Sequence, residues 1–296
     1  MIQSRKSLLL YSILLLSPSL VVLFLTLLFP SFWAFILSFF DYQLGMTKEF
    51  AGFANYRKIL VDGLVFWQSL LKTGIMTIFI VVGELLLGIG FALLLSRKIY
   101  RFQKLLVAII IAPMAVSPVV GVTIWKYMLA PNFGIINYVL SLLGIQNPNW
   151  FVDPTFVFIA IGLIDIWMCS PFVFTIIYPS ILSIDPTLHE AALIDGATYV
   201  QRLQYIVFPL VSPAIITTTI FRIINALRLF SPVWLFAQGG PFGSSRVLSI
   251  YLYEQAFSYY RFGFGSAVAW LLLIITFVIS LPQMRAMQKI LKKDTY

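Results

Sequence analysis

Residues 183–209 read SIDPTLHEAALIDGATYVQRLQYIVFP, and this stretch decides the architecture of the chain. Asp185 followed by Pro186 predicts a helix start, because aspartate accepts hydrogen bonds from free N–H groups and proline has none to lose at the first helical position. The helix is expected to run to about Ile194.

The same stretch predicts a second short helix after a sharp turn. Asp195-Gly196 is a stop signal, because glycine adopts the left-handed conformation without a steric penalty. Thr198 and Gln201 have the spacing of a capping box, in which each side chain bonds to a backbone N–H at the other's position. This second helix is expected to reach about Pro209.

The first short helix has an unusual face. Leu188, Ala191 and Ala192 fall at positions i, i+3 and i+4, beside Glu190. Helices that lie on a membrane surface prefer Lys or Arg together with large apolar residues. This helix has no Lys or Arg and only a small apolar face, so a protein partner is the better physical interpretation.

The composition around this loop is that of a polytopic membrane protein. Of 296 residues, 60% are hydrophobic and 10% are charged, which is too few charges to cover the surface of a soluble enzyme and too many apolar groups for disorder. The only cysteine (Cys169) and the only histidine (His189) cannot build an intrachain disulfide framework or a Cys/His zinc cage. The net charge of +9 is attributed to topology and lipid head groups, and no nucleic-acid-binding motif is visible.

Apolar stretches long enough to cross a bilayer predict an all-α integral membrane fold within a single transmembrane domain, residues 1–296. Each stretch has about 20 or more mostly apolar residues. Six spans are expected, with the 183–209 loop between the fourth and the fifth, at about 8–40, 73–95, 105–129, 156–180, 206–236 and 264–284.

The distribution of basic residues predicts the topology. Lys and Arg concentrate in cytoplasmic loops of membrane proteins. Six spans with both termini inside place eleven basic residues on the cytoplasmic side, namely Arg5, Lys6, Arg97, Lys98, Arg101, Lys104, Arg202, Arg285, Lys289, Lys292 and Lys293. Five then lie in the outer loops, namely Lys48, Arg57, Lys58, Arg246 and Arg261. The 183–209 loop is therefore expected to be cytoplasmic, together with both termini.

The residues of this loop carry a resemblance to a known family. Glu190-Ala-Ala-x-x-Asp195-Gly196-Ala, with Phe208-Pro209 some twelve residues after the glycine, is similar to the EAA loop of bacterial ABC-importer permeases. The subfamily that the chain resembles is that of the carbohydrate-uptake permeases of the maltose and glycerol-phosphate type. Those permeases commonly have Leu-Pro where this chain has Phe-Pro.

Three external segments support the same resemblance. They are Phe50-Ala-Gly-Phe-Ala-Asn55-Tyr56 after the first span, Gly134-Ile-Ile-Asn137-Tyr with Trp150 and Asp153-Pro154 after the third, and Gln238-Gly-Gly-Pro241 with Tyr251-x-Tyr253 and Ala256-Phe257 before the sixth.

The resemblance implies a mechanism and a set of partners. The loop is implied to be a coupling helix, with Glu190, Ala191 and Ala192 facing an ATP-hydrolysing subunit, Gly196 making the bend and Asp195 bracing it. The implied partners are a pair of ATP-binding subunits, a second homologous permease and an extracytoplasmic solute-binding protein. The chain has no G-x-x-x-x-G-K-[ST] phosphate loop, so it is not expected to be an enzyme or to hold a cofactor or a metal.

Several polar residues within the spans are candidates for the solute path, because ionisable groups are expensive in the membrane. The candidates are Glu84, Asp165, Trp167, Arg222, Asn225 and Arg228. Arg222, Asn225 and Arg228 step by three along the fifth span and are expected to share one broad sector. The alternative is a structural ion pair, for example Glu84 or Asp165 with one of the two arginines.

The sequence thus predicts the transmembrane subunit of an ATP-driven ABC importer of the bacterial cytoplasmic membrane. Its expected solute is carbohydrate-like, including anionic sugars, and its expected mechanism is alternating access. An ion-coupled secondary transporter is the main alternative, with Glu84 and Asp165 as proton or sodium sites. A membrane-embedded enzyme is disfavoured, because one histidine and few acids cannot build a polar catalytic cluster.

Overall fold

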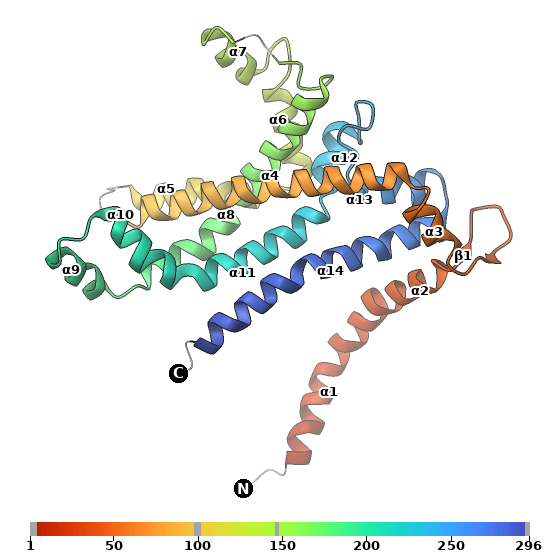
Figure 1. Cartoon of the computed structure of the whole chain (residues 1–296), viewed down its shortest axis with the longest axis horizontal. Coiled ribbons are helices and arrows are strands. Elements are labelled where there is room, and N and C mark those ends of the chain that lie inside the picture. Colours follow the sequence, from red (N-terminus) through yellow and green to blue (C-terminus); the bar gives the residue numbers. More distant parts are fainter. Residues whose placement is uncertain (1–4, 98–101, 146–147, 294–296) are drawn as a thin grey trace. The chain divides into compact units, whose positions relative to one another are not determined.

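The computed structural model confirms an all-α chain with only one two-stranded hairpin among the described residues 5–97, 102–145 and 148–293 (Figure 1). Lys98 and Arg101, two of the basic residues expected in the cytoplasm, lie outside these ranges. The long helices are α1 (Arg5–Leu23), α2 (Phe29–Leu37), α4 (Leu64–Leu95), α8 (Pro154–Leu182), α11 (Phe208–Leu227) and α14 (Phe262–Lys293). The shorter elements are β1 (Phe40–Asp41), β2 (Glu49–Phe50), α3 (Ala54–Leu60), α5 (Gln103–Ile111), α6 (Pro118–Met128), α7 (Ile135–Leu142), α9 (Pro186–Ile194), α10 (Tyr199–Arg202), α12 (Ser231–Ala237) and α13 (Leu248–Tyr253).

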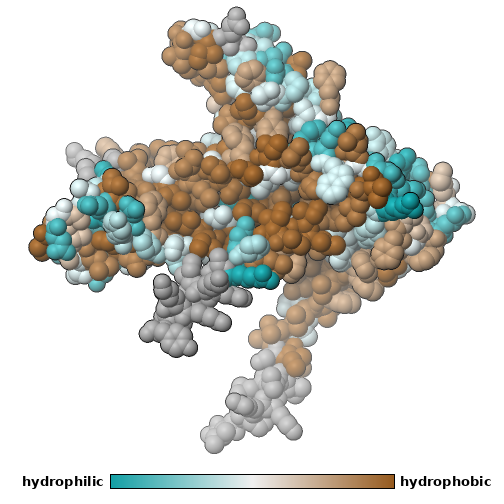
Figure 2. Space-filling model, in the orientation of Figure 1, coloured by the Kyte–Doolittle hydropathy of each residue, from teal (hydrophilic) through white to brown (hydrophobic). Residues whose placement is uncertain are grey.

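Within the described residues, five helical stretches are long and apolar enough to cross a membrane, and one bent pair brings the number to six. The five are Ile13–Leu37, Leu64–Leu95, Pro154–Leu182, Tyr199–Leu227 and Phe262–Arg285. Figure 2 shows the hydrophobic surface that covers the long helices, with hydrophilic residues at the loop that carries α9 and α10. Six apolar crossings therefore agree with the prediction.

The third predicted span is broken rather than straight. Gln103–Ala115 and Pro118–Met128 meet at an angle of 104°. Val116 and Ser117 are extended between them, because a residue that precedes proline is disfavoured in the α conformation. The Ser117 hydroxyl then caps α6 by accepting from the Val120 N–H. The prolines that the sequence places in this span thus divide it into two helices.

The fifth predicted span, 206–236, is wrong at its outer end. The helix begins earlier, at Tyr199, and α11 ends at Leu227, where Arg228 takes a non-helical C-cap conformation. A new helix, α12, starts at Ser231 with Pro232 in its first turn. The apolar residues up to Phe236 misled the prediction, because they belong to a separate buried helix.

The described residues divide into two compact units, which we describe separately. The first comprises the residues up to Leu64 together with Leu252–Leu273, and the second comprises Val65–Tyr251 together with the residues from Ile274 onward. The single permease domain expected from the sequence stays a prediction.

In the first unit, Asn55 closes the turn after the first span. Its Nδ2 donates to the carbonyl oxygens of Ser38 and Phe40, each at 2.9 Å, and the residue is 2% exposed. The Ser38 hydroxyl lies 2.7 Å from the Tyr56 hydroxyl. Asn55 and Tyr56, which carried part of the sequence resemblance, are therefore structural in this unit.

In the second unit, α8 is the central helix. Of its most apolar stretch 56% is buried, against 33% for α4. Its buried side chains, such as Val157, Ile161 and Val173, pack against α4, α11 and the helices around them. Residues on α8 are consequently surrounded by protein along most of the span.

Gly88 lets α4 approach α8 closely. A Cβ at this position would lie 2.5 Å from the Val173 side chain and 3.0 Å from the Phe174 backbone nitrogen. Ala92, one turn later, is fully buried. The Gly88-x-x-x-Ala92 pair is therefore a helix contact of the small-residue type.

We expect Gly88→Ala to lower the free energy of unfolding by about 1–3 kcal/mol, the usual effect of overpacking, because the backbone of α8 must move. Gly90→Ala is the matched control, since a Cβ there meets no atom within 4 Å. Thermal unfolding of the purified chain in detergent measures both. Equal midpoints for the two variants would contradict the close contact.

Candidate functional site

The loop between α8 and α11 contains the helix that the sequence predicts. Asp185 caps α9, since its Oδ1 accepts from the Thr187 N–H at 2.9 Å, and Pro186 is the first helical residue. This hydrogen bond holds the pKa of the Asp185 carboxyl below its ordinary value. The cap is thus fully ionised at neutral pH, and its contribution is lost only as the pH falls through that lowered pKa.

The end of α9 follows the predicted glycine signal. Gly196 has φ +75°, the left-handed conformation, and the Ala197 N–H donates to the Ala192 carbonyl at 2.8 Å. No atom lies within 4 Å of a Cβ built on Gly196, so backbone conformation alone selects glycine here. Asp195 is the C-cap residue.

Most of the side chains of α9 are exposed to solvent. None of its residues is buried, and Leu188, Leu193 and Ile194 are 45%, 55% and 87% exposed. Glu190 and Ala191 are also exposed, and Ala192 is half-buried. A nine-residue helix with this much uncovered apolar surface is suited to packing against another molecule.

The second part of the loop joins α9 to a spanning helix without a flexible break. The capping box between Thr198 and Gln201 is present, with the Thr198 N–H donating to Gln201 Oε1 at 2.7 Å. From Tyr199 the chain is helical through α10 and a π-helical turn, Leu203–Val207, into α11. One short turn, Asp195–Thr198, is therefore all that separates α9 from the helix Tyr199–Leu227.

Inside the second unit, three charged side chains meet from three helices. Arg222 on α11 donates to Glu84 on α4 through Nε and Nη2, each at 2.6 Å from a different carboxylate oxygen. The same Nη2 lies 3.3 Å from Asp165 Oδ2 on α8. All three are buried, with Glu84 at 0% exposure. The fork geometry of arginine matches the first carboxylate, and this arrangement holds α4, α8 and α11 in register.

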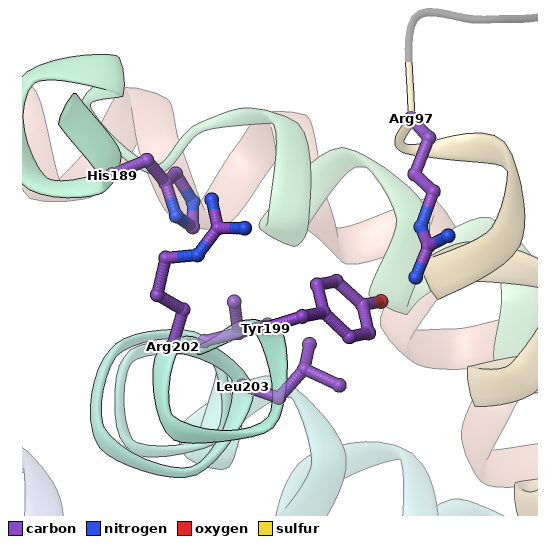
Figure 3. Close-up of a pocket in the computed structure, with 6 residues that line it drawn as sticks. Arg97, His189, Tyr199, Arg202 and Leu203 are labelled. Carbon is purple, nitrogen blue, oxygen red and sulfur yellow. The ribbon is translucent and has the colours of Figure 1, made fainter. Parts of the chain in front are cut away.

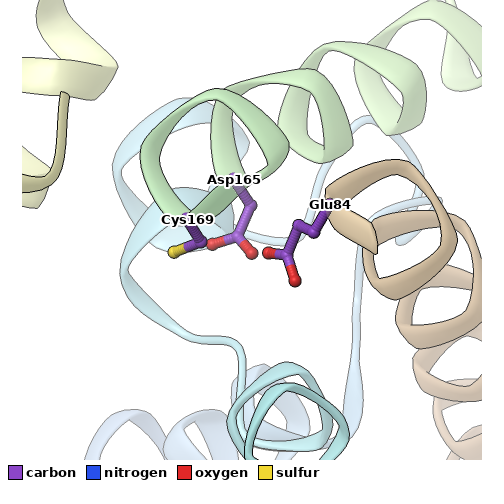
Figure 4. Close-up of side chains that lie close together, drawn as sticks. All are labelled: Glu84, Asp165 and Cys169. Atoms are coloured by element: carbon purple, nitrogen blue, oxygen red, sulfur yellow. The ribbon is translucent and has the colours of Figure 1, made fainter. Parts of the chain in front are cut away.

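Figure 4 shows Cys169 beside the two carboxylates. Donor atoms of Glu84, Asp165 and Cys169 lie within 4.8 Å of one another, which is close enough to be tested as a metal site. Both carboxylates already contact the Arg222 guanidinium, which occupies the space between them and supplies one positive charge. The donor set therefore fits an ion cluster better than a metal centre.

The remaining candidates do not join this cluster. Trp167 is half-buried and packs edge-on against Trp125, at 6.1 Å between ring centroids, beside an apolar hollow of about 370 Å³. Arg222, Asn225 and Arg228, which are expected to share one broad sector, differ in burial, since only Arg222 is buried. Asn225 is exposed and its Nδ2 donates back to the Phe221 carbonyl at 2.8 Å, and Arg228 is exposed at the helix end. A step of three residues turns a helix by about 300°, so successive members move off the buried face.

The segment after the third span that carries part of the family resemblance is held by polar contacts. Asn137 donates to the carbonyls of Leu129 and Ala130, each at 3.0 Å, and accepts from the Trp150 indole N–H at 2.8 Å. Asp153 caps α8 by accepting from the N–H groups of the next turn. These residues fix the shape of the segment between α6 and α8.

The sequence did not predict two hydrogen bonds that join α4 to the start of α13 and to the loop before it. Lys72 donates to the Gly243 carbonyl at 2.6 Å, and the Thr73 hydroxyl accepts from the Leu248 N–H at 2.8 Å. Both partners are more than 170 positions away in the chain. The only signal was a polar pair at the end of an apolar helix, which does not identify a partner.

Comparison with known proteins gives a consistent result. Residues 84–293 match the family described as "Binding-protein-dependent transport system inner membrane component". The chain is 34% identical over 268 residues to the trehalose/maltose transport system permease protein MalF of Thermococcus litoralis, covering 89% of this chain and 88% of that protein. It is 32% identical over 278 residues to the sulfoquinovosyl glycerol transport system permease protein SmoG of Agrobacterium fabrum, covering 93% and 90%.

A solved structure shares the fold. A chain of a bacterial ABC transporter involved in the import of the acidic polysaccharide alginate superposes with a TM-score of 0.82, covering 96% of both chains at 22% sequence identity. At that identity the likeness concerns the fold.

Proposed function

Because the chain belongs to the family of binding-protein-dependent transport system inner membrane components, we propose that it is the membrane-spanning subunit of an ATP-driven importer of carbohydrate-like solutes. The observation that carries the proposal is the exposed helix α9, joined by one turn to a spanning helix. The names of the relatives, which refer to trehalose, maltose and sulfoquinovosyl glycerol, support the solute class.

In this proposal α9 is the contact with an ATP-hydrolysing subunit. Glu190 supplies a directional charge, while Ala191 and Ala192 allow a partner to approach closely. Gly196 provides the bend and Asp195 ends the helix, so that movement of α9 reaches α11. The loop and both termini lie in the cytoplasm, as the basic residues favour.

The complete assembly contains a pair of ATP-binding subunits, a second permease and an extracytoplasmic solute-binding protein. Closure of the ATP-binding pair moves α9, and the helices open alternately to the two sides of the membrane. Trp167 and Asn225, on α8 and α11, are the strongest candidates for contact with solute, since neither side chain belongs to the ion cluster. Arg228 is the basic side chain that remains available for an acidic sugar.

The ion-coupled alternative is weakened by the ion cluster. Glu84 and Asp165 both contact Arg222, so neither carboxylate is open to receive a sodium ion from an aqueous cavity. A coupling site for cations needs oxygen ligands that water can reach, and Glu84 and Asp165 are 0% and 6% exposed.

Reconstitution of the chain with its ATP-binding, permease and binding-protein partners in proteoliposomes tests the proposal. We expect uptake of at least one saccharide from a panel of neutral and acidic sugars. Uptake should require hydrolysable ATP on the side of the membrane on which α9 lies. Uptake driven by a proton or sodium gradient without nucleotide would refute it.

Arg228→Gln is expected to reduce uptake of acidic saccharides more than that of neutral ones, and an equal loss would remove Arg228 from solute recognition.

A further inference from the structure

A basic pocket lies between the α9–α10 loop and the end of α4 (Figure 3). Its volume is about 470 Å³, and it is bounded by the end of α4 and by the loop itself (Figure 3). The lining residues are Arg97, His189, Tyr199, Arg202, Leu203 and Val207. All six belong to the second compact unit.

The pocket holds two guanidinium groups around one aromatic ring. Arg97 Cζ lies 4.1 Å from the centroid of the Tyr199 ring, and Arg202 Cζ lies 5.9 Å from it. Contact with a ring face leaves guanidinium N–H donors available. Arg202 Nε is buried and has no hydrogen-bond partner among the described residues.

The pocket has no acid to balance these charges. No Asp or Glu lines it, and neither arginine forms an ion pair with a described carboxylate. Arg222, in contrast, meets two carboxylates. Two guanidinium groups with an unused buried donor and no counter-ion favour a bound anion, and a phosphate is the anion that matches the arginine fork.

The apolar residues of the pocket favour the phosphate of a lipid head group over free phosphate. Leu203 and Val207 are apolar and belong to the start of the spanning stretch Tyr199–Leu227, and Arg97 directly follows the end of the spanning helix α4. Two spanning stretches therefore end at the pocket, which puts it at the depth of lipid head groups. Tyrosine with basic residues above an apolar wall is the arrangement that recognises anionic lipids at the cytoplasmic surface.

We propose that this pocket binds the phosphate of an anionic phospholipid, with the acyl chains along the apolar wall below it. Such a lipid bridges Arg97, at the end of α4, and Arg202, on α10. It would thereby hold the α9–α10 loop at a fixed position against the transmembrane helices. This assignment rests on the membrane location of the family and on the cytoplasmic side that we propose for the loop, and it does not depend on the solute or on the role of α9.

Lipid binding to the purified complex tests the proposal. The full chain with its partner subunits is titrated in detergent with dioleoylphosphatidylglycerol or dioleoylphosphatidylcholine, and bound lipid is counted by native mass spectrometry. Each arginine near a membrane surface contributes roughly fivefold to the affinity for anionic lipid. We therefore expect Arg97→Gln/Arg202→Gln to weaken phosphatidylglycerol binding about 25-fold. The matched control is Arg57→Gln/Arg261→Gln, which removes the same charge from two exposed positions in the loops expected on the opposite side and should change the affinity less than twofold.

The wild-type complex gives a test that needs no variant. It should bind phosphatidylglycerol at least tenfold more tightly than phosphatidylcholine, and 10 mM inorganic phosphate should not displace the lipid. Lack of discrimination between the two lipids overturns the proposal. Full displacement by inorganic phosphate identifies a site for free phosphate instead. Unchanged lipid binding with release of the ATP-binding subunit from the double variant identifies a protein contact, and this also overturns it.

Discussion

Arg222→Gln is expected to lower the free energy of unfolding by about 3–5 kcal/mol, because it removes one partner of a buried ion cluster. Glu84 and Asp165 would remain in the protein interior without their counter-charge. Chemical or thermal unfolding of the detergent-purified chain measures the change. Arg228→Gln removes the same charge from an exposed position on the same helix and should change stability by less than about 0.5 kcal/mol.

A second substitution separates a structural ion cluster from a solute contact. Glu84→Gln in the Arg222→Gln background removes one of the two unpaired carboxylates, so the double variant should be more stable than Arg222→Gln alone. The coupling energy expected for such neighbours is about 0.5–3 kcal/mol. If Arg222→Gln unfolds like wild type and loses only transport, the three residues act on solute, and the structural interpretation is wrong.

Glu190→Lys is expected to abolish ATP-driven uptake while the chain still inserts and folds. Glu190 is exposed on α9, so the substitution disturbs no internal contact. At an interface, placing like charges together costs several kcal/mol, which corresponds to a loss of more than about 100-fold in affinity for the ATP-binding subunit. Co-purification of that subunit and saccharide uptake are the two measurements.

Glu49→Lys is the matched control for this experiment, because it makes the same charge change at an exposed position outside the α8–α11 loop. It should leave both co-purification and uptake at wild-type levels. If Glu190→Lys retains the ATP-binding subunit and full uptake, α9 is not the coupling contact. The family assignment would stand, but the role that we give to Glu190, Ala191 and Ala192 would fall.

The local structure of the α8–α11 loop was predictable because its signals act within a few residues. Asp185-Pro186 caps a helix through bonds to its own first turn, and Gly196 ends it through its own φ angle. The capping box of Thr198 and Gln201 spans three positions. Such interactions do not depend on where the rest of the chain lies.

The predictions that failed concerned breaks and faces in long apolar stretches. Hydrophobicity does not distinguish the end of α11 at Leu227 from its continuation, because α12 is also apolar and buried. Nor did residue spacing show that, of the candidates Arg222, Asn225 and Arg228, only Arg222 contacts α4 and α8. The partners of a buried charge are chosen by packing, and Glu84 is 138 positions distant from Arg222 in the chain.

The sequence alone determined that the chain is a six-span helical membrane protein with a capped helix exposed in the loop after the fourth span. Apolar composition and local capping are properties of the residues themselves, and they require no knowledge of distant neighbours. Only the tertiary structure decided that Glu84, Asp165 and Arg222 form one cluster and that Arg97 and Arg202 share a pocket. The physical reason is that electrostatic energy depends on the distance between charges, and that distance is fixed by how the helices pack.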